Sequence, residues 1–187
     1  DAITSLERMM HRGAVAADGK SGDGSWLLLS IPDQFMRKVA LEGGVDLPKQ
    51  YAIAMVFSTD DKQLNTFKNY CEKNDLKVIL NRDVPVDKEV LGEQALAILP
   101  NISQIFVVPN TPVSSKRFEA MLYLARKEAE HALEDQDDFY IPTFSSKVIA
   151  YKGLVMPTTI RQFYIDLQDE DFKSSFALFH QRFSTNT

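Results

Sequence analysis

Apolar positions along the chain follow either a helical spacing or short continuous runs. The helical spacing, together with residues typical of helix starts, predicts helices over residues 1–11, 34–41, 60–74, 93–99, 114–133 and 157–163. The short apolar runs predict strands over residues 26–31, 51–57, 76–80, 104–108, 139–141, 147–151 and 174–182. Strands and helices therefore both contribute substantially to the fold.

The order of these elements adds detail. Strands and helices alternate between residues 51 and 108, which indicates an α/β block. The runs 26–31 and 51–57 lack polar alternation, so we expect both strands to be buried on both faces. The runs 139–141 and 147–151 are close enough in sequence to pair as antiparallel neighbours.

Composition narrows the class of protein. The chain has 187 residues, enough for a core of one domain, and a net charge of −5, which provides no basic footprint for nucleic acid. No apolar stretch reaches the roughly 18 residues of a membrane-spanning helix. The single cysteine, Cys71, excludes an internal disulfide and fits a reducing compartment. Because helical spacing begins at the first residues, we expect the chain to be a piece of a larger protein.

Several chemical motifs can be set aside. Gly19-Lys20-Ser21 lacks the earlier glycine of a phosphate-binding loop and precedes a strand instead of a helix. The three histidines, at positions 11, 131 and 180, are far apart, so a metal site is not expected. Cys71 lies on the apolar face of a predicted helix, which favours a buried packing residue over a nucleophile.

The C-terminal strand ends in an unusual polar sequence. The apolar run at residues 176–179 predicts a buried strand, and Arg182 with hydroxyl and amide side chains follows it. The planar guanidinium of arginine suits a carboxylate held by two parallel hydrogen bonds. One interpretation is therefore a carboxylate-binding pocket at the strand end. The other is an arginine that pairs with an acidic residue of its own fold or reaches solvent.

Two long stretches resemble a known family. The sequence HRGAVAADGKSGDG at residues 11–24, the strand and Ile-Pro after it, and the sequences SSKVIAYKGL and FYIDLQDEDFKSSFALFHQRFSTNT resemble the glutaminase domain of the glutamate synthase large subunit. The motifs occur in the same order and reach both ends of the chain, whereas residues 35–135 resemble the family only weakly. One departure is Ser25-Trp26, where the family usually has small residues.

The resemblance implies a fold and a domain arrangement. The fold would be the α/β (α+β) N-terminal-nucleophile hydrolase sandwich, four layers in the order α/β/β/α with mainly antiparallel sheets. Residues 1–187 would form part of one class II glutamine amidotransferase domain. The block at about 51–108 would be extra structure on that fold.

The resemblance also implies site residues. Arg182 matches the family arginine that grips the α-carboxylate of glutamine, and Ser184 and Thr185 match residues lining the same end of the pocket. Arg12 and Gly13 match the Arg-Gly turn beside the nucleophile. The nucleophile itself would be an N-terminal cysteine upstream of Asp1, and its α-amino group would act as the general base.

The parent protein implied by the resemblance hydrolyses glutamine to glutamate and ammonia. A synthase domain of the same polypeptide would use the ammonia with 2-oxoglutarate, flavin mononucleotide (FMN) and an iron–sulfur cluster, with a small NAD(P)H-oxidising subunit as partner. No cofactor and no metal is expected on this chain. The compartment would be the bacterial cytoplasm or the plastid stroma. The alternatives are a module that senses glutamine without cleaving it and a structural domain in which Arg182 is an internal ion pair.

Overall fold

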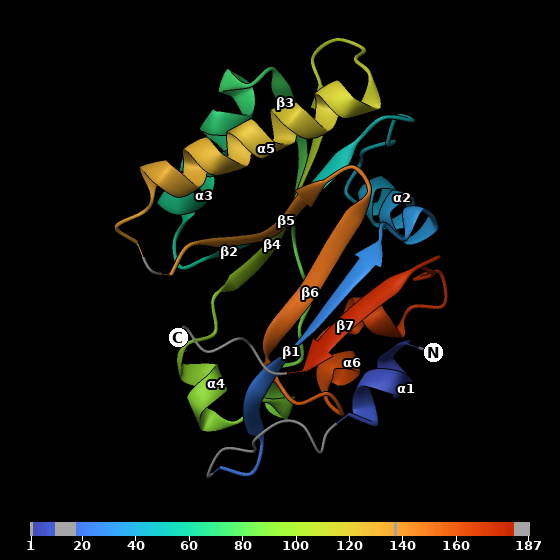
Figure 1. The fold of residues 1–187 in the computed structure, drawn as a ribbon, viewed down its shortest axis with the longest axis vertical. Helices are drawn as coiled ribbons and strands as arrows, with labels where there is room; N and C mark the ends of the chain where they lie inside the picture. The colour runs from blue at the N-terminus through green and yellow to red at the C-terminus, as the bar shows by residue number, and fades with distance from the viewer. Residues whose placement is uncertain (1, 10–17, 137, 182–187) are drawn as a thin grey trace. The chain divides into compact units, whose positions relative to one another are not determined.

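The computed structural model describes residues 2–9, 18–136 and 138–181, and its residues divide into two compact units (Figure 1). The first unit draws on segments 1–32, 84–99 and 150–187. The second draws on segments 33–83 and 100–149. Each unit has its own sheet and its own helices.

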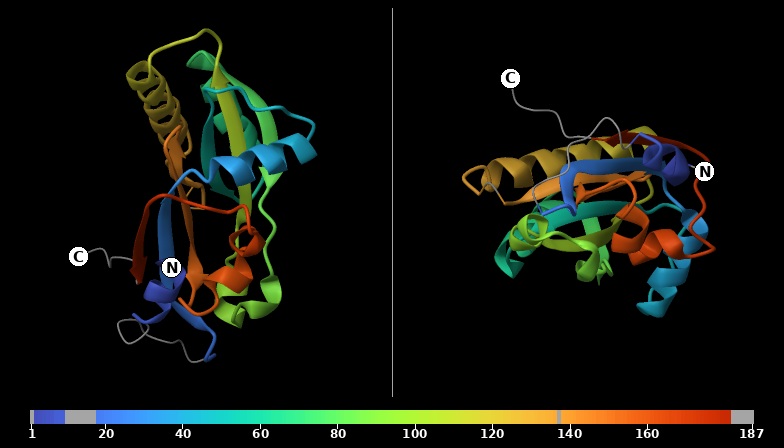
Figure 2. Two further views of the ribbon diagram at one scale, coloured as in Figure 1. Left: turned by 90° about the vertical axis from the view of Figure 1, so that its right-hand side faces the viewer. Right: turned by 90° about the horizontal axis from the view of Figure 1, so that it is seen from below.

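The sheet of the first unit has the strand order β6-β1-β7. Its strands are β1 (Ser21–Ser30), β6 (Val148–Val155) and β7 (Ala177–Gln181). β7 pairs antiparallel with β1 and forms one edge of the sheet (Figure 2). The helices of this unit are α1 (Ala2–Glu7), η2 (Lys88–Val90), α4 (Glu93–Ala97), α6 (Ile160–Phe163) and η3 (Ile165–Gln168).

Aromatic rings form much of the core of the first unit. Tyr151 and Tyr164 meet edge to face with centroids 4.9 Å apart, and the ring of Phe172 lies 5.5 Å from that of Tyr151. The hydroxyl of Tyr151 donates to the buried carboxylate of Asp166 at 2.9 Å, and that of Tyr164 donates to the carbonyl oxygen of Lys152 at 2.6 Å. Burial raises the pKa of Tyr164, so its phenol stays protonated and keeps this bond.

The sheet of the second unit has the order β3-β4-β2-β5, and its neighbouring strands are antiparallel. Its strands are β2 (Ala52–Ser58), β3 (Leu76–Asp83), β4 (Asn101–Pro109) and β5 (Tyr140–Ser145). Three helices complete the unit: α2 (Asp33–Glu42), α3 (Asp61–Lys73) and α5 (Ser115–Ala132). Helices α3 and α5 pack against each other and against this sheet (Figure 1).

The two longest helices begin where the sequence predicts. The carboxylate of Asp60 accepts from the backbone N–H of Gln63 at 2.8 Å, and the hydroxyl of Ser114 accepts from that of Arg117 at 3.2 Å. Each bond satisfies a donor that the first helical turn leaves unpaired. The predicted apolar stripe of α5 is buried from Phe118 to Ala129, but Ala132 is exposed.

The predicted class is confirmed: two antiparallel sheets flanked by helices form an α+β fold. The stacking of four layers in the order α/β/β/α stays a prediction. So does the status of residues 51–108 as extra structure. Within that block, residues 84–99 belong to the first unit and the remaining residues to the second.

Three predictions about individual elements are wrong. The strands over 139–141 and 147–151 do not pair, because β5 joins β2 and β6 lies in the sheet of β1. Strand β1 starts at Ser21, five residues before the predicted start at residue 26. β1 is also not buried on both faces: Leu27 and Leu29 are buried, whereas Trp26 and Leu28 are half-buried.

Boundaries differ at the short helices. The first helix ends at Glu7 instead of residue 11, and the helix predicted from Pro157 starts at Ile160 after a turn. Strand β3 continues to Asp83, through residues predicted to form a turn. Local side-chain preferences change by only fractions of a kcal/mol per residue, so packing decides where such short elements end.

Candidate functional site

The site residues predicted from the sequence lie outside the described residues. This holds for Arg182, Ser184 and Thr185 at one end of the chain and for Arg12 and Gly13 near the other. The structure does describe the segments that adjoin them, namely the end of β7 and the turn that leads into β1. Both segments belong to the first unit, so the contacts of each can be described within one unit.

Strand β7 ends, just before Arg182, in a layer of buried polar side chains. Gln181, the last residue of β7, is buried and lies opposite Ser25 of β1. Ser25 is fully buried, and its hydroxyl donates to the carbonyl oxygen of Val155 in β6 at 2.8 Å. The Ser25 hydroxyl bond connects β1 to β6, and the register pair connects β1 to β7, so this layer joins all three strands. The strand end that precedes position 182 is therefore held by its neighbouring strands.

The outer face of β7 is not buried, which corrects the expectation of a buried strand. Leu178 is 50% exposed and His180 is also exposed, whereas Ala177 and Phe179 on the other face are half-buried. An edge strand with one open face explains the alternation. The apolar run alone does not reveal the open face, because Leu178 lies on that face and Phe179 on the other.

The turn before β1 is held by one carboxylate. Asp18 accepts from the backbone N–H of Lys20 at 3.0 Å, from that of Ser21 at 2.7 Å and from the hydroxyl of Ser21 at 2.5 Å. These bonds, led by the Ser21 hydroxyl, lower the pKa of Asp18 to about 2. Asp18 is therefore ionised at neutral pH and fixes the start of β1.

Gly92 lets the same turn approach helix α4. A Cβ atom at position 92 would collide with the carboxylate of Asp18 and the hydroxyl of Ser21. The Ser21 hydroxyl oxygen also accepts from the backbone N–H of Ala95 at 3.4 Å. We call Asp18, Ser21 and Gly92 the turn clamp. No pattern in the sequence assigned a role to Asp18 or singled out Gly92.

Comparison with known proteins identifies the family. The model of the class-II glutamine amidotransferases matches residues 1–187. The chain belongs to this family. It is 36% identical over 201 residues to the glutamate synthase [NADPH] large chain of Azospirillum brasilense, covering 99% of this chain and 13% of that protein.

Further relatives of this class-II amidotransferase chain carry similar names. It is 38% identical over 189 residues to the glutamate synthase [NADPH] large chain of Bacillus subtilis, covering 97% of this chain and 12% of that protein. It is 40% identical over 200 residues to the ferredoxin-dependent glutamate synthase of Cyanidium caldarium, covering 100% of this chain and 13% of that protein. The chain thus spans about one-eighth of the length of these relatives.

The cysteine within the amidotransferase chain is unsuited to nucleophilic attack. Cys71 lies on α3 in the second unit and is fully buried. Burial, with a smaller contribution from Glu72, raises the pKa of its thiol to about 12. Attack requires the thiolate, which is almost absent at neutral pH with such a pKa. The prediction that Cys71 is a packing residue is confirmed.

Other reactive side chains of the amidotransferase chain are dispersed. His131 is exposed and contacts Glu134 at 2.8 Å, and His180 is exposed on β7. Among the residues that the structure describes, no three His, Cys, Asp or Glu side chains gather as they would around a metal ion. The described helices also include none long and apolar enough to cross a membrane.

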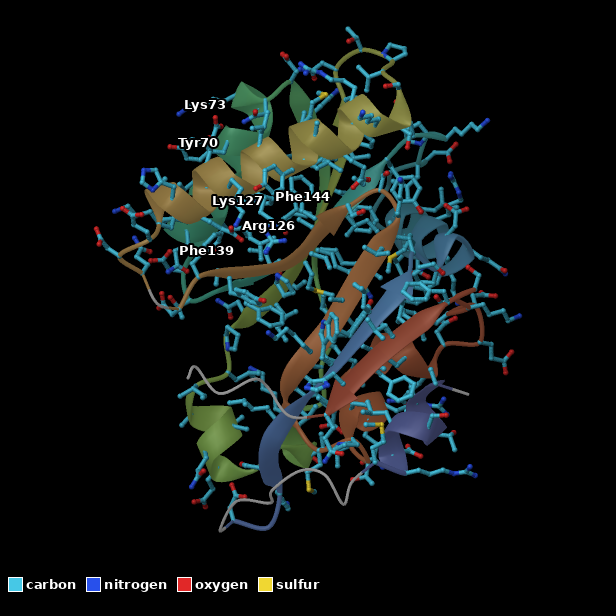
Figure 3. The ribbon with its side chains drawn as sticks, in the orientation of Figure 1. Tyr70, Lys73, Arg126, Lys127, Phe139 and Phe144 are labelled. Carbon is cyan, nitrogen blue, oxygen red and sulfur yellow. The ribbon has the colours of Figure 1, made fainter. Side chains whose placement is uncertain are left out.

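Three cationic side chains of α3 and α5 have partners within the second unit (Figure 3). Arg126 and Lys127 both pair with Glu130, at 2.7 Å and 2.8 Å. The ammonium group of Lys73 lies 4.4 Å from the ring centre of Tyr70. Glu130 therefore offsets part of the positive charge of Arg126 and Lys127.

Proposed function

We propose that this chain is the glutaminase part of a glutamate synthase. The observation that carries the proposal is the match of the class-II amidotransferase family over all 187 residues. Relatives whose names say glutamate synthase, at 36–40% identity over nearly the whole chain, support the same conclusion. The reaction is hydrolysis of the glutamine side-chain amide to glutamate and ammonia.

The site combines residues from both ends of the chain. Arg182 binds the α-carboxylate of glutamine with two parallel hydrogen bonds, and Ser184 and Thr185 line the same end of the pocket. The buried layer formed by Gln181 and Ser25 supports this role, because a fork at the end of a fixed strand loses little freedom on binding.

The nucleophile is an N-terminal cysteine that precedes Asp1 in the longer protein. Its α-amino group accepts the thiol proton, and the thiolate adds to the side-chain carbonyl carbon to form a tetrahedral intermediate. The same amino group returns the proton to the amide nitrogen, the C–N bond breaks, and ammonia leaves. Water then hydrolyses the thioester that remains, which releases glutamate and the thiol. Arg12 and Gly13 form the turn beside it. The turn clamp supports this placement, since it fixes Asp18 only five positions after Gly13.

The rest of the parent protein supplies the second half of the reaction. Ammonia passes to a synthase domain of the same polypeptide, which combines it with 2-oxoglutarate using FMN and an iron–sulfur cluster. This chain has one cysteine, and it is buried, so the cluster belongs elsewhere. The names of the relatives include NADPH, NADH and ferredoxin, so they leave the electron donor open.

The proposal also covers the partner subunit and the cellular compartment. A small NAD(P)H-oxidising subunit is the partner if the donor is a pyridine nucleotide. The compartment is the bacterial cytoplasm or the plastid stroma; the name of one Arabidopsis relative contains the words chloroplastic/mitochondrial.

Ammonia release tests the proposal. The 187-residue chain should release none from glutamine, because it lacks the nucleophile. The same chain within its natural upstream and downstream sequence should release ammonia continuously. Binding of glutamine without release by the longer protein, together with a residue other than cysteine at its mature N-terminus, would establish the sensing module instead.

A further inference from the structure

A cavity in the first unit is lined by residues other than those of the proposed glutamine pocket. It has a volume of about 270 Å³ and lies beside the buried face of β1, where Leu27 and Leu29 line it. Ile3 of α1, Leu167 of η3 and Phe172 line it as well. The described residues thus give it a predominantly apolar lining, typical of sites that bind small organic molecules.

Two cationic side chains also line this cavity. They are Arg161 at α6 and Lys173 in the segment before β7, and both are exposed. No acidic side chain is among the described residues of the lining. An apolar cavity with positive charge at its exposed side attracts a molecule that has an apolar body and an anionic group.

The register of the sheet places part of this lining away from the Ser25–Gln181 pair. The lining residues Leu29 and Ala177 lie opposite each other near one end of the β1–β7 pair, while Ser25 and Gln181 lie opposite each other at the other end. Ala177 is four positions, or about 13 Å, from Gln181, whereas the lining residue Leu27 is two positions from Ser25. Glutamine is also a poor occupant, because its amide would lose hydrogen bonds to water against an apolar lining.

We propose that this cavity is a second binding site, for a small amphiphilic carboxylate. A volume of about 270 Å³ lies just below the usual range of ligand pockets, so it suits a short alkyl chain or a single ring. The apolar body lies against Ile3, Leu29 and Phe172, and the carboxylate lies near Lys173. The inference is independent of the glutaminase proposal, because no residue of the cavity belongs to that site.

Octanoate is the probe that tests the proposal. Isothermal titration of the natural-length protein should show saturable binding of octanoate, and hexanoate and butanoate should bind progressively more weakly. Each methylene withdrawn from water should change the affinity about fourfold. Octan-1-ol, which lacks the charge, should bind more weakly than octanoate.

Three variants locate the binding. Lys173→Gln should weaken octanoate binding about three- to fivefold, as expected for one partly exposed charge pair. Ala177→Phe fills the cavity and should abolish binding. Lys147→Gln, which removes an exposed cation from the second unit, is the matched control and should leave the affinity unchanged.

Four outcomes overturn the proposal. They are no saturable binding at millimolar octanoate, equal affinity in all three variants, affinities that do not depend on chain length, and binding to the 187-residue chain but not to the natural-length protein. The last result would show that the protein's own chain fills the cavity. If circular dichroism shows that Ala177→Phe does not fold, Lys173→Gln and the chain-length series still decide.

Discussion

Ser25 and Gln181 are register partners, and both are buried at the end of the β1–β7 pair from which the chain continues to Arg182. Ser25 also bonds β6 through the carbonyl oxygen of Val155. Ser25 thus contacts both strands that flank β1. The same unit contains the turn clamp.

Gly92→Ala should destabilise the protein by about 1–3 kcal/mol, the usual cost of overpacking, because the new methyl group collides with Asp18 and Ser21. Urea unfolding measures this change. Gly153→Ala is the control, since its nearest neighbour, the Phe163 ring, is 3.7 Å away. Combining Gly92→Ala with Asp18→Ala should cost less than the sum of the two single changes. Additive costs would show that the two residues do not interact.

Asp18 should make stability depend on pH in the acid range. Its pKa in the folded protein is about 2, below the roughly 3.9 of an unfolded chain. The unfolded chain therefore binds the proton first, so the contribution of Asp18 is complete above about pH 4 and is lost as the pH falls toward 2. The gap in melting temperature between wild type and Asp18→Asn should narrow over that window. A constant gap would contradict the assigned hydrogen bonds.

Tyr151→Phe should cost about 1–3 kcal/mol of unfolding free energy, because the buried carboxylate of Asp166 loses a donor. Tyr123→Phe, at a tyrosine that is 60% exposed, is the matched control and should change stability little. Chemical denaturation of both variants provides the comparison. Equal stability of the two would mean that the Tyr151 hydroxyl contributes nothing to the core.

The sequence predicted the fold best where one physical signal dominates. Asp60 and Ser114 are strong helix-capping residues, and α3 and α5 begin immediately after them. It failed at residues 139–151, where proximity in sequence predicted a hairpin and the two strands instead joined different sheets. Strand pairing depends on surfaces formed by distant segments, which a local pattern does not contain.

The candidate site also has one part that the sequence reveals and one part that it does not. Arg182 is recognisable in the sequence because a charged fork after an apolar strand is unusual. The contact between Asp18 and Gly92 is not, because 74 positions separate them and glycine has no side chain to signal a partner. The family resemblance supplied the reaction, which no pattern of composition or spacing indicates.

Arg182→Ala in the natural-length protein should lower kcat/KM for glutamine. The loss of transition-state stabilisation should be about 2–5 kcal/mol, the usual cost of removing one partner of a buried charge pair. The loss should appear mainly in KM, since the α-carboxylate is remote from the amide that is cut. Arg182→Lys should recover only part of it. Arg12→Ala should act mainly on kcat. Steady-state kinetics separates these effects, with Lys77→Ala on the second unit as control.

Two results would refute this role for Arg182. Unfolding of Arg182→Ala would favour the internal ion pair. Unchanged KM in a folded variant would place the carboxylate pocket elsewhere.

The most direct test of the glutaminase proposal is covalent labelling. A glutamine analogue bearing an electrophile should be incubated with the natural-length protein, and mass spectrometry should locate the adduct. We predict one label on a cysteine at the mature N-terminus and none on Cys71, whose thiol is buried and has a raised pKa. A label on Cys71 or any other internal residue, or no label in a protein that releases ammonia, would contradict the proposal.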